Sequence, residues 1–292
     1  MAKQTNIDIS SRVHRLEQSY FALGEFSDVY KCQLDSQSGS EKVAVKVIRG
    51  YSPNEDRRMK LRQEIGALVG TWQGFYHENI IHCFGISNDF GYLPGLVLPL
   101  CNEGTITKYA RSQSSSRKLD VLLQVSSALK YLHFNKFVHT DVRGANILVH
   151  NGKPLLMDGG LAPLLNNGEF TVAGVSGRAR WMAPELLDPP EELADCGASS
   201  CTFESDIYSL GMTILEVMTG DKPYCHRRYE TSVILDVVRG VKPNRPEVPV
   251  VSDGVWSIIE ACWERAENRP SAIMVEAWID MLRYVDAGNI YP

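Results

Sequence analysis

The chain has 292 residues, of which 44% are apolar and 22% are charged, enough for one large domain or two moderate ones around a sizeable core. Its formal net charge of −5 lacks the basic excess of proteins that bind nucleic acids or anionic membranes, so we expect neither partner. The polar residues 1–8 predict no secretory leader, and the apolar run at 95–101 is too short to cross a bilayer. We therefore expect a soluble, intracellular protein of the cytoplasm that acts as a monomer.

Short runs rich in Val, Tyr and Phe, punctuated by Gly or Ser, predict β-strands through the first third of the chain. They cover residues 12–23, 27–34, 42–48, 80–86 and 92–98. Between the third and fourth runs, the apolar spacing at 54–69 predicts one helix, which Asn54 can cap.

After residue 104 the hydrophobic period becomes that of α-helices. One apolar stripe is formed by Leu119, Leu122, Val125, Leu129 and Leu132. Further helical patterns cover residues 205–219, 232–238, 252–264 and 271–285, separated by Gly and Pro.

Together these patterns predict an α+β fold with two lobes. Residues 1–98 form a small β-rich N-lobe, 99–104 a hinge and 105–292 a larger helical C-lobe. The crevice between two such lobes is a common place for a ligand.

Seven cysteines are spread over the chain, an odd number, and no pair has the C-x-x-C spacing of a zinc site. Free thiols in a reducing compartment are the favoured interpretation. A metal site formed by Cys196, Cys201 and His226 is the alternative.

An apolar strand ends in a lysine at Val43-Ala-Val-Lys46, and Glu64 lies on the helix that follows. This arrangement resembles the protein-kinase family. The resemblance implies a Lys46–Glu64 ion pair that directs the lysine at the α- and β-phosphates of ATP. For the strand taken alone, an ordinary surface lysine is the alternative.

The segment Val138-His-Thr-Asp-Val-Arg-Gly-Ala-Asn146 is similar to the catalytic loop of the same family. By this resemblance Asp141 accepts the proton of the substrate hydroxyl, Arg143 steadies the γ-phosphoryl group, and Asn146 binds Mg²⁺ through a hard oxygen. Such residues are common in any polar loop. The spacing from Asp141 to Asn146, followed by an apolar strand, favours the catalytic interpretation.

Met157-Asp158-Gly-Gly160 stands where the family has its metal-binding Asp-Phe-Gly, after a short strand predicted at 154–157. The resemblance implies that Asp158 chelates Mg²⁺ between the β- and γ-phosphates. For an isolated Asp-Gly pair, a simple turn is the alternative.

Three later segments extend the resemblance to the whole domain. They are Arg180-Trp-Met-Ala-Pro-Glu185, Ser205-Asp-Ile-Tyr-Ser-Leu-Gly211, and Cys262-Trp263 followed by Asn268-Arg-Pro270. By resemblance, Glu185 and Arg269 form an ion pair, and Asp206 accepts backbone N–H groups of the catalytic loop. The matches run in family order from about residue 12 to 285, so we expect the bilobal protein-kinase fold.

The resemblance also implies an adenine-nucleotide site, whose residues roof the base, line its walls or form hydrogen bonds from the hinge. They are Phe21, Gly24, Val29, Ala44, Leu98, Pro99, Cys101 and Leu148. Taken singly, each of these is more typical of core packing.

Two departures from the family concern phosphate groups. The loop Ala22-Leu-Gly24-Glu-Phe-Ser27 keeps one glycine of three, which predicts a stiffer loop with a looser hold on ATP. Thr140 replaces an arginine that pairs with an activation-segment phosphate in many members. Phosphorylation of Thr171 or Ser176 therefore has no anchor at this position.

A third departure is Gly159, in place of the Phe of Asp-Phe-Gly. By resemblance, that ring packs between His139 and Leu68. Its loss predicts missing apolar contacts and greater backbone freedom beside Asp158.

The sequence thus predicts an ATP-dependent kinase with Mg²⁺ as cofactor and protein hydroxyls as substrate. Trp181-Met-Ala-Pro and the closing helices resemble the tyrosine-kinase-like group of Ser/Thr kinases, whereas Arg143 resembles one arrangement in tyrosine kinases. Gly159 and the altered phosphate loop keep open a pseudokinase that binds nucleotide or a partner. A small-molecule phosphotransferase ranks last, because that class lacks the Ala-Pro-Glu and closing segments.

Overall fold

The computed structural model describes residues 7–24, 27–37, 39–50, 54–165, 177–189 and 201–286. They fall into two compact units. The first draws on Met1–Tyr76, Ile80–Cys101 and Leu164–Gly174, and the second on His77–Asn79, Asn102–Pro163 and Val175–Pro292. None of the helices in the described part of the chain has the length and apolar character that a bilayer crossing requires.

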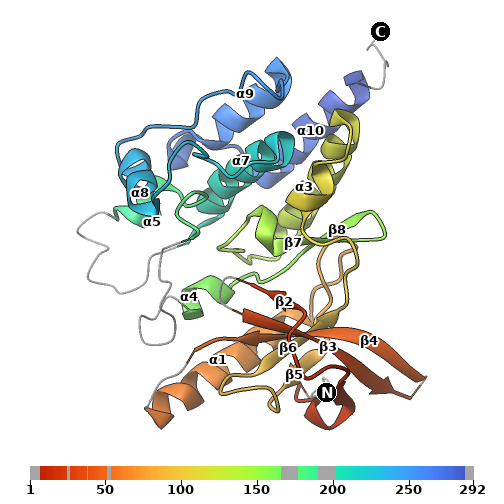
Figure 1. Ribbon diagram of the computed structural model, residues 1–292. Helices are drawn as coiled ribbons and strands as arrows, with labels where there is room; N and C mark the ends of the chain where they lie inside the picture. The colour runs from red at the N-terminus through yellow and green to blue at the C-terminus, as the bar shows by residue number, and fades with distance from the viewer. Residues whose placement is uncertain are drawn as a thin grey trace. The chain divides into compact units, whose positions relative to one another are not determined.

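The described residues of the first unit form an antiparallel sheet with the strand order β1-β3-β4-β6-β5, in which β2 also pairs with β3 (Figure 1). The strands are β1 (Val13–Arg15), β2 (Ala22–Leu23), β3 (Ser27–Ser36), β4 (Gly39–Ile48), β5 (Gly85–Ser87) and β6 (Gly95–Pro99). Their order in the chain agrees with the strand-rich first third that the sequence predicts.

Alternation along β4 decides which of its side chains enter the core of this unit. Val43, Val45 and Val47 join one buried apolar cluster. Because successive side chains of a strand point to opposite faces, Ala44 and Lys46 lie on the other face of the sheet. These two residues, which are predicted to contact a nucleotide, therefore lie on the face of β4 opposite the cluster of Val43, Val45 and Val47.

Helix α1 (Glu55–Trp72) is the helix predicted within the strand-rich part. The Asn54 side chain accepts a hydrogen bond from the Arg57 backbone N–H at 3.1 Å, so it caps the helix as the sequence predicts. Leu61 and Ile65 are buried on one side of the helix.

The second unit is mainly helical. Its elements are α2 (Ile106–Ala110), α3 (Ser115–Phe134), β7 (Ile147–His150), β8 (Lys153–Leu156), α5 (Pro184–Leu187), α7 (Phe203–Thr219), α8 (Glu230–Val238), α9 (Asp253–Cys262) and α10 (Ala272–Asp286). Helix α4 (Leu161–Leu165) follows β8 in the chain. Helix α3 packs against α10, and α7 packs against α3 and α9 (Figure 1).

Helix α7 is the central helix of this unit, with every residue from Ser205 to Met218 buried. Thr202 and Ser205 form a reciprocal capping box at its start, and Gly220 ends it with a φ of 80°, which glycine adopts without strain. A helix buried all round needs a hydrogen-bond partner for each of its polar side chains. Several of those partners lie in the loop around Asp141 and in the segment around Trp181.

The predicted α+β class, with strands first and helices after, is confirmed. The lobe boundaries 1–98, 99–104 and 105–292 stay a prediction.

Candidate active site

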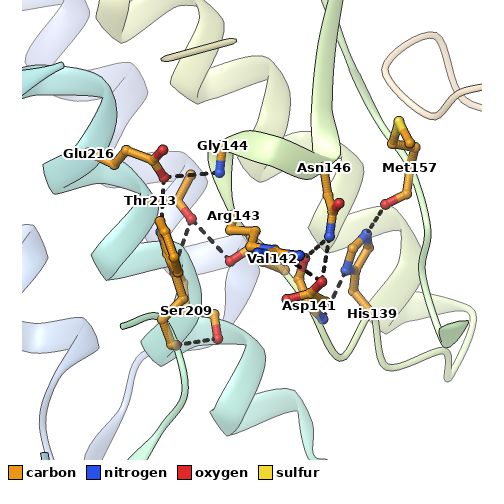
Figure 2. Close-up of polar contacts among 11 residues, drawn as sticks. His139, Asp141, Val142, Arg143, Gly144, Asn146, Met157, Ser209, Thr213 and Glu216 are labelled. Carbon is orange, nitrogen blue, oxygen red and sulfur yellow. Dashed lines mark hydrogen bonds and ion pairs between the residues drawn. The ribbon is translucent and has the colours of Figure 1, made fainter. Parts of the chain in front are cut away.

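Asp141 lies in a loop between α3 and β7, where two neighbouring side chains hold its carboxylate. Its Oδ2 atom accepts hydrogen bonds from Asn146 Nδ2 at 2.7 Å and from Arg143 Nε at 3.1 Å (Figure 2). Asn146 Nδ2 also donates to the Asp141 carbonyl oxygen at 2.9 Å. The structure therefore brings together the three residues that the sequence predicts for the catalytic loop.

His139 ties this loop to the segment that contains Asp158. It is 1% exposed, and its Nδ1 accepts from the Asp141 backbone N–H at 3.3 Å. The hydrogen-bond network thus assigns the proton to Nε2, which donates to the Met157 carbonyl oxygen at 3.0 Å. Burial lowers the pKa of His139, so the neutral ring that these bonds require is favoured.

Asp206, at the start of α7, accepts hydrogen bonds from the backbone of the loop, as the resemblance implies. The His139 and Thr140 N–H groups donate to its two carboxylate oxygens at 2.7 and 2.8 Å. Thr140 has a φ of 74°, a conformation that costs energy for a β-branched residue. The buried carboxylate holds the backbone in this strained turn next to Asp141.

Three more polar residues of α7, namely Ser209, Thr213 and Glu216, form hydrogen bonds to neighbouring segments. Thr213 Oγ1 donates to the Val142 carbonyl oxygen at 3.1 Å, and Ser209 Oγ donates to the Trp181 carbonyl oxygen at 2.8 Å. Figure 2 shows Thr213 directed at the loop around Asp141, whereas Ser209 bonds to the separate segment that contains Trp181.

Glu216 is the last of these residues and the most constrained. It is 4% exposed and accepts from Thr107 Oγ1 at 2.7 Å, from the Gly144 N–H at 3.0 Å and from Trp181 Nε1 at 2.9 Å. Burial raises the pKa of this carboxyl group. A single side chain thus joins the catalytic loop to the Trp-Met-Ala-Pro segment.

Sequence reasoning missed Ser209, Thr213 and Glu216. Together with Asp206 they recur at helical spacing within an otherwise apolar run. Polar residues on one face of a helix that is apolar elsewhere were the available signal.

Asp158 follows β8 and is 8% exposed. Asp158 has a φ of 67°. The N–H of the preceding residue, Met157, donates to the Asn146 carbonyl oxygen at 2.9 Å, and this hydrogen bond connects the Asp158 segment to the loop around Asp141. The donor set fits Mg²⁺, since a carboxylate and an amide oxygen are hard ligands. Asn146 uses its Nδ2 toward Asp141, which leaves its Oδ1 as the atom suited to a cation.

Gly159 differs from the sequence-based expectation. A Cβ atom placed on Gly159 would lie 2.9 Å from Phe137 Cε1 and 3.2 Å from His139 Cδ2. The Phe137 ring therefore already fills the space next to the Gly159 backbone. The prediction that packing is missing there is wrong.

Lys46 and Glu64 belong to the first unit. Lys46 lies in β4, paired with Val29 of β3 and Leu96 of β6. Glu64 lies 3.9 Å from Lys60 on its own helix, and its side chain is 42% exposed. The ion pair expected between Lys46 and Glu64, and its catalytic role, stay a prediction.

The ends of the loop that is predicted to cover the phosphates lie in β2 and β3, at Ala22 and Ser27. Phe21 is exposed, and its N–H donates to the Val29 carbonyl oxygen at 2.9 Å. The Gly24 N–H donates to the Ser27 carbonyl oxygen at 2.7 Å, and a Cβ on Gly24 would lie 2.5 Å from Ser27 Oγ. A side chain at position 24 would therefore require the Ser27 hydroxyl to move.

The remaining predicted nucleotide contacts are spread over two elements of the first unit and one of the second. Ala44 pairs with Leu98 across β4 and β6, next to Pro99. Burial raises the pKa of the Cys101 thiol to about 11, so this residue stays neutral. Leu148 lies in β7, where it forms a bridge with Thr105.

The predicted ion pair between Glu185 and Arg269 is present. Arg269 Nη2 donates to Glu185 Oε2 at 2.9 Å and Nη1 to Oε1 at 2.5 Å, and the Arg269 side chain is 2% exposed. This bidentate pair joins α5 to the segment before α10.

Other expectations fall partly beyond the described residues. Thr171, Ser176 and Cys196 lie outside them. Cys201 and the other described cysteines are free, and no cluster of metal-ligating His, Cys, Asp or Glu side chains occurs in the described part of the chain.

Comparisons with known proteins all find similarity to protein kinases. The model of the protein kinase domain matches residues 21–278. The chain is 28% identical over 228 residues to the RAF proto-oncogene serine/threonine-protein kinase of Xenopus laevis, covering 74% of this chain and 32% of that protein. It is 34% identical over 226 residues to mitogen-activated protein kinase kinase kinase 1b of Physcomitrium patens, covering 74% of this chain and 27% of that protein.

A third relative is serine/threonine-protein kinase dst4 of Dictyostelium discoideum, 28% identical over 262 residues, with 86% of this chain and 50% of that protein covered. The chain thus spans half or less of the length of these curated relatives.

Proposed function

Because the chain belongs to the protein kinase domain family, we propose that it transfers the γ-phosphoryl group of ATP to serine or threonine hydroxyls of proteins. The family assignment confirms the predicted fold class and the resemblance to tyrosine-kinase-like Ser/Thr kinases. One observation carries the proposal: the Asp141 carboxylate is held by Arg143 and Asn146 in a loop anchored on α7.

In this proposal Asp141 orients the substrate hydroxyl and accepts its proton as the hydroxyl oxygen attacks. Its Oδ2 atom is engaged by Arg143 and Asn146, so Oδ1 is the atom that we assign to the proton. Arg143 is 5% exposed, and its Nε atom lies 3.1 Å from Asp141 Oδ2, so it fixes the direction of that carboxylate.

The cofactor is ATP with Mg²⁺, which when bound supplies the phosphoryl group and neutralises the phosphate charge. Asn146 and Asp158 would hold the cation, and Lys46 the α- and β-phosphates. The nucleotide base would contact Phe21, Val29, Ala44, Leu98 and Leu148, with Gly24 over the phosphates and Pro99 and Cys101 as backbone partners. These roles remain part of the proposal.

The relatives favour an active enzyme over a module that only binds nucleotide, since each of those reported is named a kinase. Two are named serine/threonine kinases, which supports serine or threonine as the acceptor. A protein substrate, a monomeric state and a cytoplasmic location belong to the same proposal.

The test is transfer of ³²P from γ-labelled ATP to a mixed protein substrate, followed by acid hydrolysis and separation of the phosphoamino acids. Phosphoserine and phosphothreonine are expected, and Asp158→Asn should abolish the label. Phosphotyrosine as the main product would overturn the acceptor assignment. No transfer by the wild-type chain, with Mg-nucleotide still bound, would favour the nucleotide-binding module instead.

A further inference from the structure

His139 holds both ends of the short bend from Met157 to Gly160. Its Nε2 donates to the Met157 carbonyl oxygen at 3.0 Å, and its own carbonyl oxygen accepts from the Gly160 N–H at 2.7 Å. Within the bend, Asp158 and Gly160 have φ values of 67° and 74°. The direction of the Asp158 side chain therefore depends on this bend keeping its shape.

Gly159, in the middle of the bend, lies against the ring of Phe137. The 2.9 Å between an added Cβ and Phe137 Cε1 is well below the separation of about 3.5–4.0 Å at which carbon atoms pack. The ring therefore already occupies the place where a side chain at position 159 would begin. A glycine without this neighbour would have much greater backbone freedom.

Phe137 is fixed in this place by the end of α3. Its N–H donates to the Leu132 carbonyl oxygen at 3.0 Å, and Lys136 turns the chain with a φ of 59°. The half-buried ring thus projects from the turn that follows α3, which is bonded back to the helix, rather than from the bend itself.

From this contact we infer that Phe137 is a positioning residue for Asp158. Its ring supplies, from the segment before the catalytic loop, the apolar contact that Gly159 lacks, and it restricts the two glycines that follow Asp158. That Asp158 binds Mg²⁺ rests on the proposed function, whereas the packing of Phe137 on Gly159 does not.

The packing is tested by melting temperatures of the nucleotide-free protein in a double-mutant cycle. Gly159→Phe should lower Tm in the wild-type background, because two rings compete for one space. In the Phe137→Ala background the same change should raise Tm, because the ring then fills the cavity. Equal losses in both backgrounds would show that Phe137 does not fill the space and would overturn the inference.

The positioning role is tested by the Mg²⁺ dependence of binding of the ATP analogue AMP-PNP, measured by calorimetry. Phe137→Ala should raise the Mg²⁺ concentration for half-maximal binding about tenfold, the scale seen when residues that orient metal ligands are removed. The double variant should recover most of this loss. Phe134→Ala is the matched control, since that ring ends the same helix and is 82% exposed.

Phe137→Leu replaces Phe137→Ala if the alanine variant does not fold. A lower Tm with an unchanged Mg²⁺ requirement would make Phe137 a purely structural residue, and the inference would be wrong. If wild-type binding of AMP-PNP does not depend on Mg²⁺, the proposed function fails. In that case the claim for Asp158 falls with it, while the melting cycle still decides the packing.

Discussion

The side-chain amide of Asn146 donates a hydrogen bond to Asp141 Oδ2 at 2.7 Å, so the proposed magnesium ligand also orients the proposed proton acceptor. The amide oxygen and nitrogen of an asparagine point in different directions from the same carbon atom. The donor can therefore face Asp141 while the acceptor faces a cation. One side chain links the two halves of the proposed chemistry.

Asn146→Asp tests this link, because it keeps a hard oxygen ligand but replaces the donor by a second carboxylate. Two carboxylates at hydrogen-bond distance cannot both ionise easily, so one pKa of the pair rises. The acidic limb of the pH–rate profile should move up by at least about one pH unit. Asn135→Asp, at an exposed helix end, is the control, and an unshifted limb in Asn146→Asp would contradict the proposed link.

Gly144→Ala tests the close approach of the catalytic loop to α7. An added Cβ would collide with Thr107 Oγ1 and lie 2.6 Å from Glu216 Oε1. We expect a loss of about 1–3 kcal/mol in the free energy of unfolding, from overpacking. Thr107→Ala should relieve part of this loss in the double variant.

The control for Gly144→Ala has the opposite expected sign. A Cβ on Gly66 in α1 meets nothing within 4 Å. Gly66→Ala should therefore stabilise the protein by about 0.4–1 kcal/mol, because alanine favours helices and restricts the unfolded chain. Urea unfolding measures both variants, and equal effects of the two changes would refute the close approach.

Glu216 gives a prediction for pH. Burial raises its pKa in the folded protein above the ordinary value of 4.5, so between the two pKa values the folded state binds more protons than the unfolded state. Stability from this group therefore falls as pH rises from 4.5 through the folded-state pKa. Glu216→Gln, which cannot ionise, should lack this fall.

The measurement is urea unfolding of wild type and Glu216→Gln at a series of pH values. The stability difference should shift in favour of the variant as pH rises through that window. Glu267→Gln, at an exposed position, is the matched control. A difference that stays constant with pH would mean that folding does not raise the pKa of Glu216.

The order of strands and helices could be predicted because each element has its own capping residue or hydrophobic period in the sequence. Asn54 caps α1 as expected. The hydrophobic period of the sequence changes from that of strands to that of helices after residue 104, where the structure becomes mainly helical. Asp141, Arg143 and Asn146 were predictable for the same reason, since they lie close together in one loop.

The residues that sequence reasoning missed act across long stretches of chain. Glu216 bonds to Gly144 and Thr107, and Phe137 fills the space beside Gly159. A single sequence shows that a phenylalanine is missing at position 159, but not that another ring reaches the same place.

The most direct test of the central claim is the rate of γ-phosphoryl transfer in a single turnover, with saturating Mg-ATP, for wild type and Asp141→Asn. The variant keeps the shape of the side chain and the charge of Arg143 but cannot accept a proton. We predict a fall of at least ~100-fold in this rate, with the affinity for Mg-AMP-PNP largely unchanged. Asp280→Asn, on the exposed side of α10, should match wild type. An Asp141→Asn variant that transfers phosphate at the wild-type rate would contradict the account.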